Sequence, residues 1–186
     1  MPNATYVTAG KPKIGGAVYR APLGTTLPTD ATTALNSAFV DLGYVSEDGV
    51  TNSNTIESDD IKAWGGDTVL ALQTDKTDTF AMTLIESMNE NVLKAVFGST
   101  NVTGTFATGI TVKANAEEQP DAAWVIDMVA RGNAKHRVVI PCGKISEIGD
   151  ITYSDTDAVG FEVTITATPD TNANTHYEYI VAASST

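Results

Sequence analysis

The sequence predicts a mainly β domain, a sandwich or partial barrel flanked by one helix. Charged residues make up only 18% of the 186 residues. Small polar residues, above all β-branched Thr, take their place, as on the solvent face of a sheet. Apolar and polar residues alternate strictly in segments such as residues 161–168, whereas helical spacing is clear only in residues 87–97. Short strands separated by turns favour a sandwich or barrel over a parallel sheet.

The N-terminal part is expected to hold an extended arm, a strand, a loop and a second strand, at residues 1–12, 14–21, 22–34 and 39–45. Residues 46–67 follow, and they are polar until the abrupt turn signal Trp64-Gly65-Gly66. A hairpin connection needs only about two to five residues. The segment is therefore expected to be a long loop with a role of its own.

Two strands are predicted next, at residues 68–73 and 79–86, with a turn at residues 74–78. The first is apolar on both faces, as in a strand that is covered on both sides. In the second, alternation directs Phe80, Met82 and Leu84 towards a core.

Residues 87–97 are predicted to form the single helix. Ser87 and Glu90 have the spacing of a capping box, and Gly98 supplies a left-handed C-terminal stop. An apolar stripe at helical spacing follows the cap, made of Met88, Val92, Leu93 and Val96.

The C-terminal half is β again, with expected strands at residues 108–113, 122–131, 135–141, 143–153, 161–168 and 177–182. In the clearest of them, Phe161, Val163 and Ile165 point inward and Glu162 points outward.

The charge balance disfavours nucleic-acid binding. The formal net charge is −12, and the longest basic run is only Lys135-His136-Arg137, whereas binders of nucleic acid cluster Lys and Arg against phosphates. No stretch of 18 apolar residues predicts a membrane span, and no signal peptide is evident. A lone Cys142 cannot form an internal disulfide, which fits assembly in a reducing cytoplasm.

The sequence gives little support for a catalytic site or for a bound metal or cofactor. His136 and His176 lie at expected strand positions without a nucleophile motif, and Cys142 has the setting of a structural thiol. Residues 154–160 resemble the start of a calcium loop but lack its central Gly and closing Glu. We therefore expect a protein that is not an enzyme and that holds no cofactor or metal.

The order of features resembles the major tail tube protein of long-tailed, non-contractile bacteriophages. The most specific parts are A-P-L-G-T-T-L-P-T at residues 21–29 and L-G-Y-V-S-E-D-G at residues 42–49, followed by Trp64-Gly65-Gly66. Together these motifs cover about the first third of the chain. The single helix and the closing strands extend the resemblance over most of it.

The resemblance implies a virion structural protein in which residues 1–186 form one tail-tube domain without a C-terminal Ig-like domain. Six copies would form a ring, rings would stack through the long loop at residues 46–67, and the tube would be a conduit for DNA ejection. Implied partners are further copies, the tape measure protein in the lumen, and tail terminator and distal tail proteins at the ends. DNA would pass without specific binding, and no membrane would be involved.

Interface residues implied by the resemblance lie in the long loop: Glu47, Asp48, Glu57, Asp59, Asp60, Trp64 and Gly65. Glu162 is the candidate for the lumen wall, since acidic walls repel phosphate within about 8–10 Å, the Debye length at moderate salt.

Three alternatives remain open. A β-sandwich binding module for carbohydrate or a receptor predicts exposed aromatic residues gathered as a platform. An acid-pair hydrolase requires carboxylates that converge in a cleft. A tail terminator, or another phage structural protein that forms a single ring, would assemble without polymerising.

Overall fold

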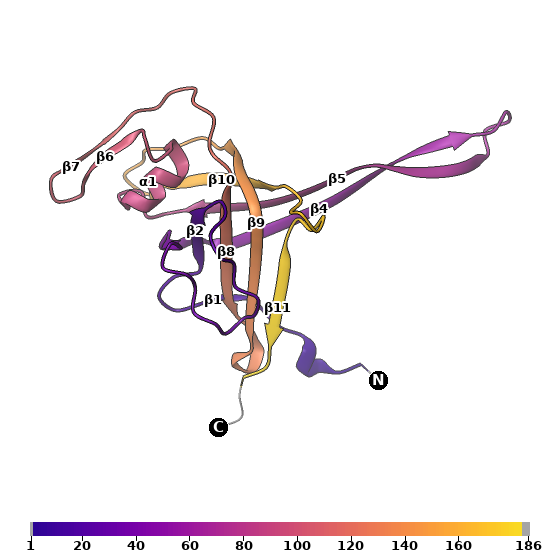
Figure 1. The fold of residues 1–186 in the computed structure, drawn as a ribbon, viewed down its shortest axis with the longest axis horizontal. Helices are drawn as coiled ribbons and strands as arrows, with labels where there is room; N and C mark the ends of the chain where they lie inside the picture. The colour runs from indigo at the N-terminus through magenta and orange to yellow at the C-terminus, as the bar shows by residue number, and fades with distance from the viewer. Residues whose placement is uncertain (1, 184–186) are drawn as a thin grey trace.

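The computed structural model describes residues 2–183, so Met1 of the expected arm and Thr186 at the expected domain end lie outside the described residues. It contains one nine-stranded antiparallel sheet, a two-stranded sheet formed by β6 and β7, and one α-helix (Figure 1). The mainly β class with one flanking helix is confirmed. The elements are η1 (Ala4–Tyr6), β1 (Lys11–Pro12), β2 (Val18–Pro22), β3 (Val40–Asp41), β4 (Val45–Lys62), β5 (Thr68–Leu84), α1 (Glu90–Phe97), β6 (Val102–Thr105), β7 (Gly109–Val112), β8 (Ala122–Val129), η2 (Arg131–Asn133), β9 (Lys135–Ile148), β10 (Phe161–Ala167) and β11 (Tyr177–Val181).

The large sheet has the strand order β3-β2-β8-β9-β10-β5-β4, and β1 and β11 pair with β8 and β9. Its main core contains buried side chains from α1 and four strands, namely Phe80, Met82, Leu84, Val92, Val96, Trp124, Ile140, Phe161, Val163 and Ile165. The inward positions predicted for β5 and β10 are thus confirmed. A second, smaller core holds Ala21, Phe39, Ala123, Val125 and Val139. Because β8 sends alternate residues into both cores, its centre is buried on both faces.

The centre of the main core is organised around Trp124. Its indole nitrogen donates a hydrogen bond to the carbonyl oxygen of Gly143 at 3.0 Å, which satisfies the polar end of a buried aromatic residue. A Cβ at Gly143 would lie 2.9 Å from Ile165 and 3.3 Å from the indole ring. Glycine is needed here because two large side chains meet over the backbone.

A buried ion pair fixes the long loop between β2 and β3. Nε and Nη2 of Arg137 donate to the two carboxylate oxygens of Asp127 at 2.6 and 2.9 Å. Nη1 donates to the carbonyl oxygens of Asp30 and Thr33 at 3.0 and 2.8 Å. The bidentate geometry, in which Arg is favoured over Lys, therefore ties this loop to the face of the sheet.

The helix begins later than the sequence predicts. It starts at Glu90, and its cap is Asn89, whose side chain accepts a hydrogen bond from the backbone nitrogen of Asn91. The predicted cap at Ser87 is wrong, because Asn is at least as good a cap as Ser and stands nearer the apolar stripe. The predicted stop is confirmed: Gly98 has φ 93° and its N–H donates to the carbonyl of Lys94.

The two strands predicted at residues 135–141 and 143–153 form one strand, β9, that ends at Ile148. Pro141 does not break it, because the pairing with β8 shifts register between Ala122 and Trp124 at that point. On its other edge, β9 pairs with β11 up to Val139 and with β10 from Gly143 onward.

The N-terminal arm is held against the end of β8. Lys11 is paired with Val129. The backbone nitrogen of Arg131 donates to Oγ1 of Thr8, and its Nη1 donates to the carbonyl of Ala4, both at 2.7 Å.

The segment expected to be a long loop is a strand. Residues 45–62 form β4, which pairs with β5 out to Lys62 and Thr68. The turn expected at residues 74–78 is absent, since β5 runs unbroken from Thr68 to Leu84. The polar composition favoured a loop at residues 46–67, and this prediction is wrong. Thr, Ser, Asn and Asp side chains are also tolerated in a solvent-exposed hairpin, because its backbone N–H and C=O groups form hydrogen bonds across the two strands.

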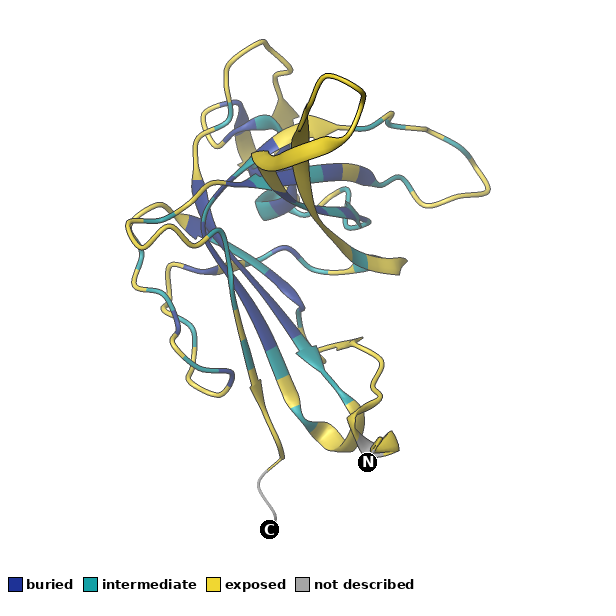
Figure 2. Cartoon of the chain, turned by 90° about the vertical axis from the view of Figure 1, so that its right-hand side faces the viewer, coloured by how far each residue is buried: buried dark blue, intermediate teal, exposed yellow. Residues whose placement is uncertain are grey.

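Every residue from Thr51 to Thr77 is exposed, and we call this segment the projecting hairpin. Figure 1 shows it extending from one end of the molecule, opposite the end that holds α1, β6 and β7. Figure 2 shows it exposed along its whole length. The expectation that residues 68–73 are covered on both faces is wrong for the isolated chain.

Candidate assembly surfaces

The tip of the projecting hairpin is a tight turn that presents Trp64. The backbone nitrogen of Ala63 donates to the carbonyl of Asp67 at 2.8 Å, and that of Gly66 donates to the carbonyl of Ala63 at 3.0 Å. Gly65 and Gly66 have φ values of 126° and 98°, a region that side chains with a Cβ rarely adopt. Trp64 is fully exposed, at 107%, so the turn holds a large aromatic side chain away from its own domain.

One face of the hairpin carries a row of apolar side chains. Cross-strand partners share a face, and Ile61 is paired with Leu70 and Asp59 with Leu72. Ile61, Leu70 and Leu72, which we call the apolar row, are 48, 49 and 47% exposed. By alternation, Ile56 lies on the opposite face, and Val69 is the extra residue where the register shifts between Ile61 and Lys62. The apolar row is not predicted from the sequence, because residues 46–67 are expected to form a loop. A local signal exists, since Ile61 and Leu70 stand almost symmetrically about the Trp64-Gly65-Gly66 turn.

The predicted acidic interface residues divide between hairpin and base. Glu57 lies opposite Asp75, and Asp59 and Asp60 follow it on alternating faces. Glu47 and Asp48 instead lie near the base, where the register of β4 shifts between Val45 and Val50. The structure therefore brings Glu57, Asp59, Asp60, Trp64 and Gly65 onto one projection and leaves the other two beside the core.

The base of the hairpin is anchored by a buried carboxylate. Asp78 is 1% exposed and accepts hydrogen bonds from Asn52 Nδ2 at 2.7 Å and Thr175 Oγ1 at 2.6 Å, with His176 Nδ1 at 2.6 Å. Burial alone would raise the pKa of Asp78, but the hydrogen bonds from Thr175, His176 and Asn52 outweigh it and leave the pKa below its ordinary value. Glu178 lies between the two histidines, 3.6 Å from His176 and 2.8 Å from His136.

The candidate lumen residue lies on the outer face of the large sheet. Glu162 of β10 is exposed and is paired with Thr83 of β5. The neighbouring cross-strand pair on that face is Thr164 with Glu147. This face therefore combines small polar side chains with carboxylates, and Lys144 at its margin is ion-paired with Glu118.

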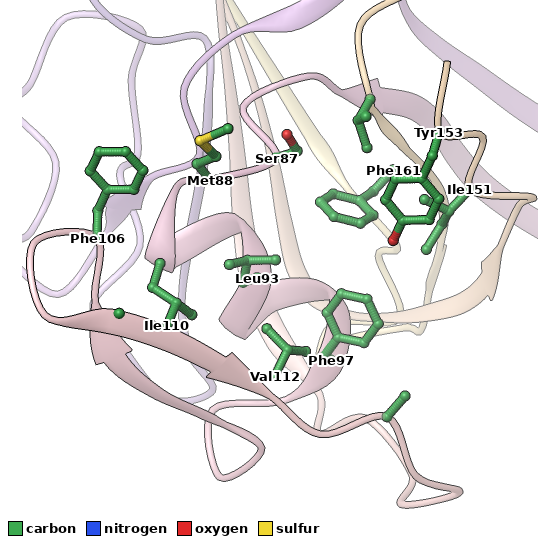
Figure 3. A pocket seen from close by; sticks show the side chains of 13 residues that line it. Ser87, Met88, Leu93, Phe97, Phe106, Ile110, Val112, Ile151, Tyr153 and Phe161 are labelled. Atoms are coloured by element: carbon green, nitrogen blue, oxygen red, sulfur yellow. The ribbon is translucent and has the colours of Figure 1, made fainter. Parts of the chain in front are cut away.

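A groove lies at the other end of the molecule, between α1, the β6–β7 hairpin and the segment before β10. It has a cavity volume of about 880 Å³, and its apolar lining includes Leu93, Phe97, Phe106, Ile110, Tyr153 and Phe161. Figure 3 shows Phe106 and Tyr153 on opposite sides of it. These two side chains are 73 and 80% exposed. The sequence shows the aromatic residues but not their convergence, which depends on three separate segments.

Within residues 2–183, no helix has the length and hydrophobicity needed to cross a bilayer. The same described part of the chain holds no group of three or more His, Cys, Asp or Glu side chains placed to bind a metal ion.

A family model described as "Phage tail tube protein" matches residues 3–185. No curated protein sequence matches the chain. Among solved structures, the chain is similar to one described as "Cryo-EM structure of the anti-feeding prophage cap (AFP tube terminating cap)", with 5% sequence identity and a TM-score of 0.45. That match covers 94% of this chain and 95% of the other, and at this level of similarity it carries no argument about function.

Proposed function

The chain belongs to the phage tail tube protein family, and on that premise we propose that it builds the tube of a long, non-contractile phage tail from stacked hexameric rings. Family membership makes it a structural component of a phage tail that is not an enzyme, and it implies self-assembly. The ring size, the stacking and the type of tail are the proposal. The projecting hairpin is the observation that carries it.

The projecting hairpin reaches beyond its own domain. A hairpin of two strands is only marginally stable by itself in water, and this one exposes Trp64 and the apolar row. Large exposed apolar side chains on a projection are typical of a surface that a partner covers. In the proposed tube, the hairpin contacts copies in the adjacent ring, with Trp64 as an aromatic anchor and the carboxylates at Glu57, Asp59 and Asp60 on its flanks.

Ring closure is proposed to use the ends of the large sheet. The sheet ends at β3 on one side and at β4 on the other. In the two-residue β3 the carbonyl oxygen of Asp41 accepts a hydrogen bond from Asn91 Nδ2, whereas the 18-residue β4 pairs with β5 alone within residues 2–183 and presents an open edge of backbone N–H and C=O groups. Such edges favour pairing with another chain. Joining the β4 edge of one copy to the β3 and β2 side of the next would continue the sheet around a ring.

The lumen wall is proposed to be the outer face of β10 and its neighbours. Glu162 and Glu147 would then face the channel among Thr side chains. Carboxylates repel the phosphates of passing DNA and provide no site that would hold them. The tape measure protein would occupy this lumen before ejection, with terminator and distal tail proteins at the tube ends.

Electron microscopy of the purified chain over a range of concentrations tests the proposal. The matched variant replaces residues 56–76 with Asn-Gly, which joins the cross-strand partners Thr55 and Thr77 by a two-residue turn of the favoured type. We expect the parent to form hollow stacked tubes and the shortened variant to stay folded without stacking. Separate rings from the parent would favour a terminator, and monomers at every concentration would contradict the tube.

A further inference from the structure

Two apolar surfaces of this chain face solvent at opposite ends of its longest axis. The first is the apolar row on the projecting hairpin. The second is the groove between α1, β6–β7 and the segment before β10. Figure 1 places the hairpin at one end of the molecule and α1, β6 and β7 at the other. The two surfaces therefore cannot meet within one copy.

The groove has the character of a binding site. Its volume of about 880 Å³ is within the range of roughly 300–1,000 Å³ that is usual for pockets that bury whole ligands. Phe106 and Tyr153 are largely exposed on its two sides (Figure 3), while Phe97 and Phe161 pack edge to face at its floor, with ring centroids 5.6 Å apart. A rigid aromatic floor with exposed aromatic walls is suited to apolar side chains.

We infer that the groove receives the apolar row of the projecting hairpin of a second copy. This inference rests on the proposed function. A contact between two different surfaces of one chain leaves a free hairpin and a free groove on every pair, so it joins copies in series. Such head-to-tail contacts give closed rings or open polymers, depending on the rotation, and a tube contains both kinds of repeat.

Charge at the two surfaces agrees with this pairing. Asp59 shares the face of the apolar row, because it is paired across the strands with Leu72. Lys113 is exposed and stands between Val112 and Ala114, both of which line the groove. The face of the apolar row therefore carries a carboxylate, and the segment that forms one wall of the groove carries an exposed lysine of opposite charge.

Disulfide trapping between two different variants tests the pairing directly. In a Cys142→Ser background, one variant carries Leu70→Cys and the other Phe106→Cys, so that any mixed disulfide is intermolecular. We expect the mixed disulfide on non-reducing gels after assembly and not at a concentration that keeps the chains monomeric. The matched control replaces Leu70→Cys with Ile56→Cys on the opposite face of the hairpin, and it should give no mixed product.

A second test uses side chains that the fold does not need. Phe106 is 73% exposed, so Phe106→Asp should retain the native circular dichroism spectrum and unfolding midpoint. We expect it to raise the critical concentration for tube formation at least tenfold, and Phe106→Leu to change it less than threefold.

Each failure separates the inference from the proposed function. Normal tubes from Phe106→Asp without a Leu70–Phe106 disulfide overturn the inference and leave the tube standing. Assembled parent tubes that bind 1-anilinonaphthalene-8-sulfonate, with binding lost in Phe106→Asp tubes, show the groove to be open to another partner and overturn it too. A parent that forms no tubes at any concentration overturns both.

Discussion

Removing the apolar row should weaken tube assembly without unfolding the subunit. The variant combines Ile61→Thr, Leu70→Thr and Leu72→Thr. Thr keeps the β-branched shape that suits a strand, and the three side chains lie in the segment from Thr51 to Thr77 that contributes nothing to the buried cores. The free energy of unfolding of the monomer should therefore stay within about 0.5 kcal/mol of that of the parent, as for ordinary surface changes.

The size of the assembly effect follows from exposure. Each of the three side chains is close to half exposed, at 47–49%, and complete burial of such a side chain is worth about 1.5–3 kcal/mol. Covering the exposed half of all three therefore contributes about 2–4 kcal/mol to one contact. Because a factor of ten in a binding constant corresponds to about 1.4 kcal/mol, the critical concentration should rise roughly 30- to 700-fold.

Sedimentation of assembled material across a dilution series measures the critical concentration, with electron microscopy of the pellets as a check on form. The matched control, Ile56→Thr, removes exposed apolar area from the opposite face of the hairpin, where Ile56 is 59% exposed. It should change the critical concentration less than threefold. A triple variant that assembles within threefold of the parent would refute the reasoning, and equal effects of the two variants would show that the face does not matter.

Four further outcomes are expected. Arg137→Met leaves buried Asp127 without its bidentate partner, and should lower the free energy of unfolding by about 3–5 kcal/mol in a denaturant titration. Because the pKa of Asp78 is lowered in the folded state, its ionised carboxylate stabilises the fold at pH values above the unfolded-state pKa, about 3.9. This contribution is lost as the pH falls through the folded-state pKa. Asp78→Asn should therefore flatten the acid limb of a plot of unfolding midpoint against pH. Trp124→Phe removes the donor to Gly143 and should cost about 1–3 kcal/mol by the same titration. Since the chain carries a formal charge of −12, raising salt from about 0.01 to 0.15 M, which shortens the Debye length from about 30 to 8 Å, should lower the critical concentration measured by sedimentation.

Sequence patterns were most informative where one face of a strand is buried. The alternation from Phe161 to Ala167 predicts both the strand and its inward side chains, because a one-residue slip would expose the whole apolar set. Residues 68–73 show the limit of the same logic. Their apolar side chains have the pattern of a strand buried on both faces, yet in the isolated chain they are exposed.

The candidate surfaces were only partly predictable. Trp64 and Gly65 carry turn signals that are local, and so the tip could be identified without a structure. The contact of Asp78 with His176 joins residues 98 positions apart, and no local signal marks it. The groove likewise depends on how Phe106 and Tyr153 are brought together by segments that do not pair with each other.

The outer edge of β4 has a further consequence for newly made subunits. Within residues 2–183, β4 pairs only with β5, so a strand of 18 residues presents an open backbone edge. Chains with such edges are prone to grow into amyloid-like sheets. Here, however, parallel in-register pairing with β4 of a second copy would place Glu57, Asp59 and Asp60 about 5 Å from the same carboxylates of that copy, a spacing at which like charges oppose pairing. The same acids should therefore keep newly made subunits from pairing through β4. Pairing would occur only when a surface of different charge binds the open edge of this strand.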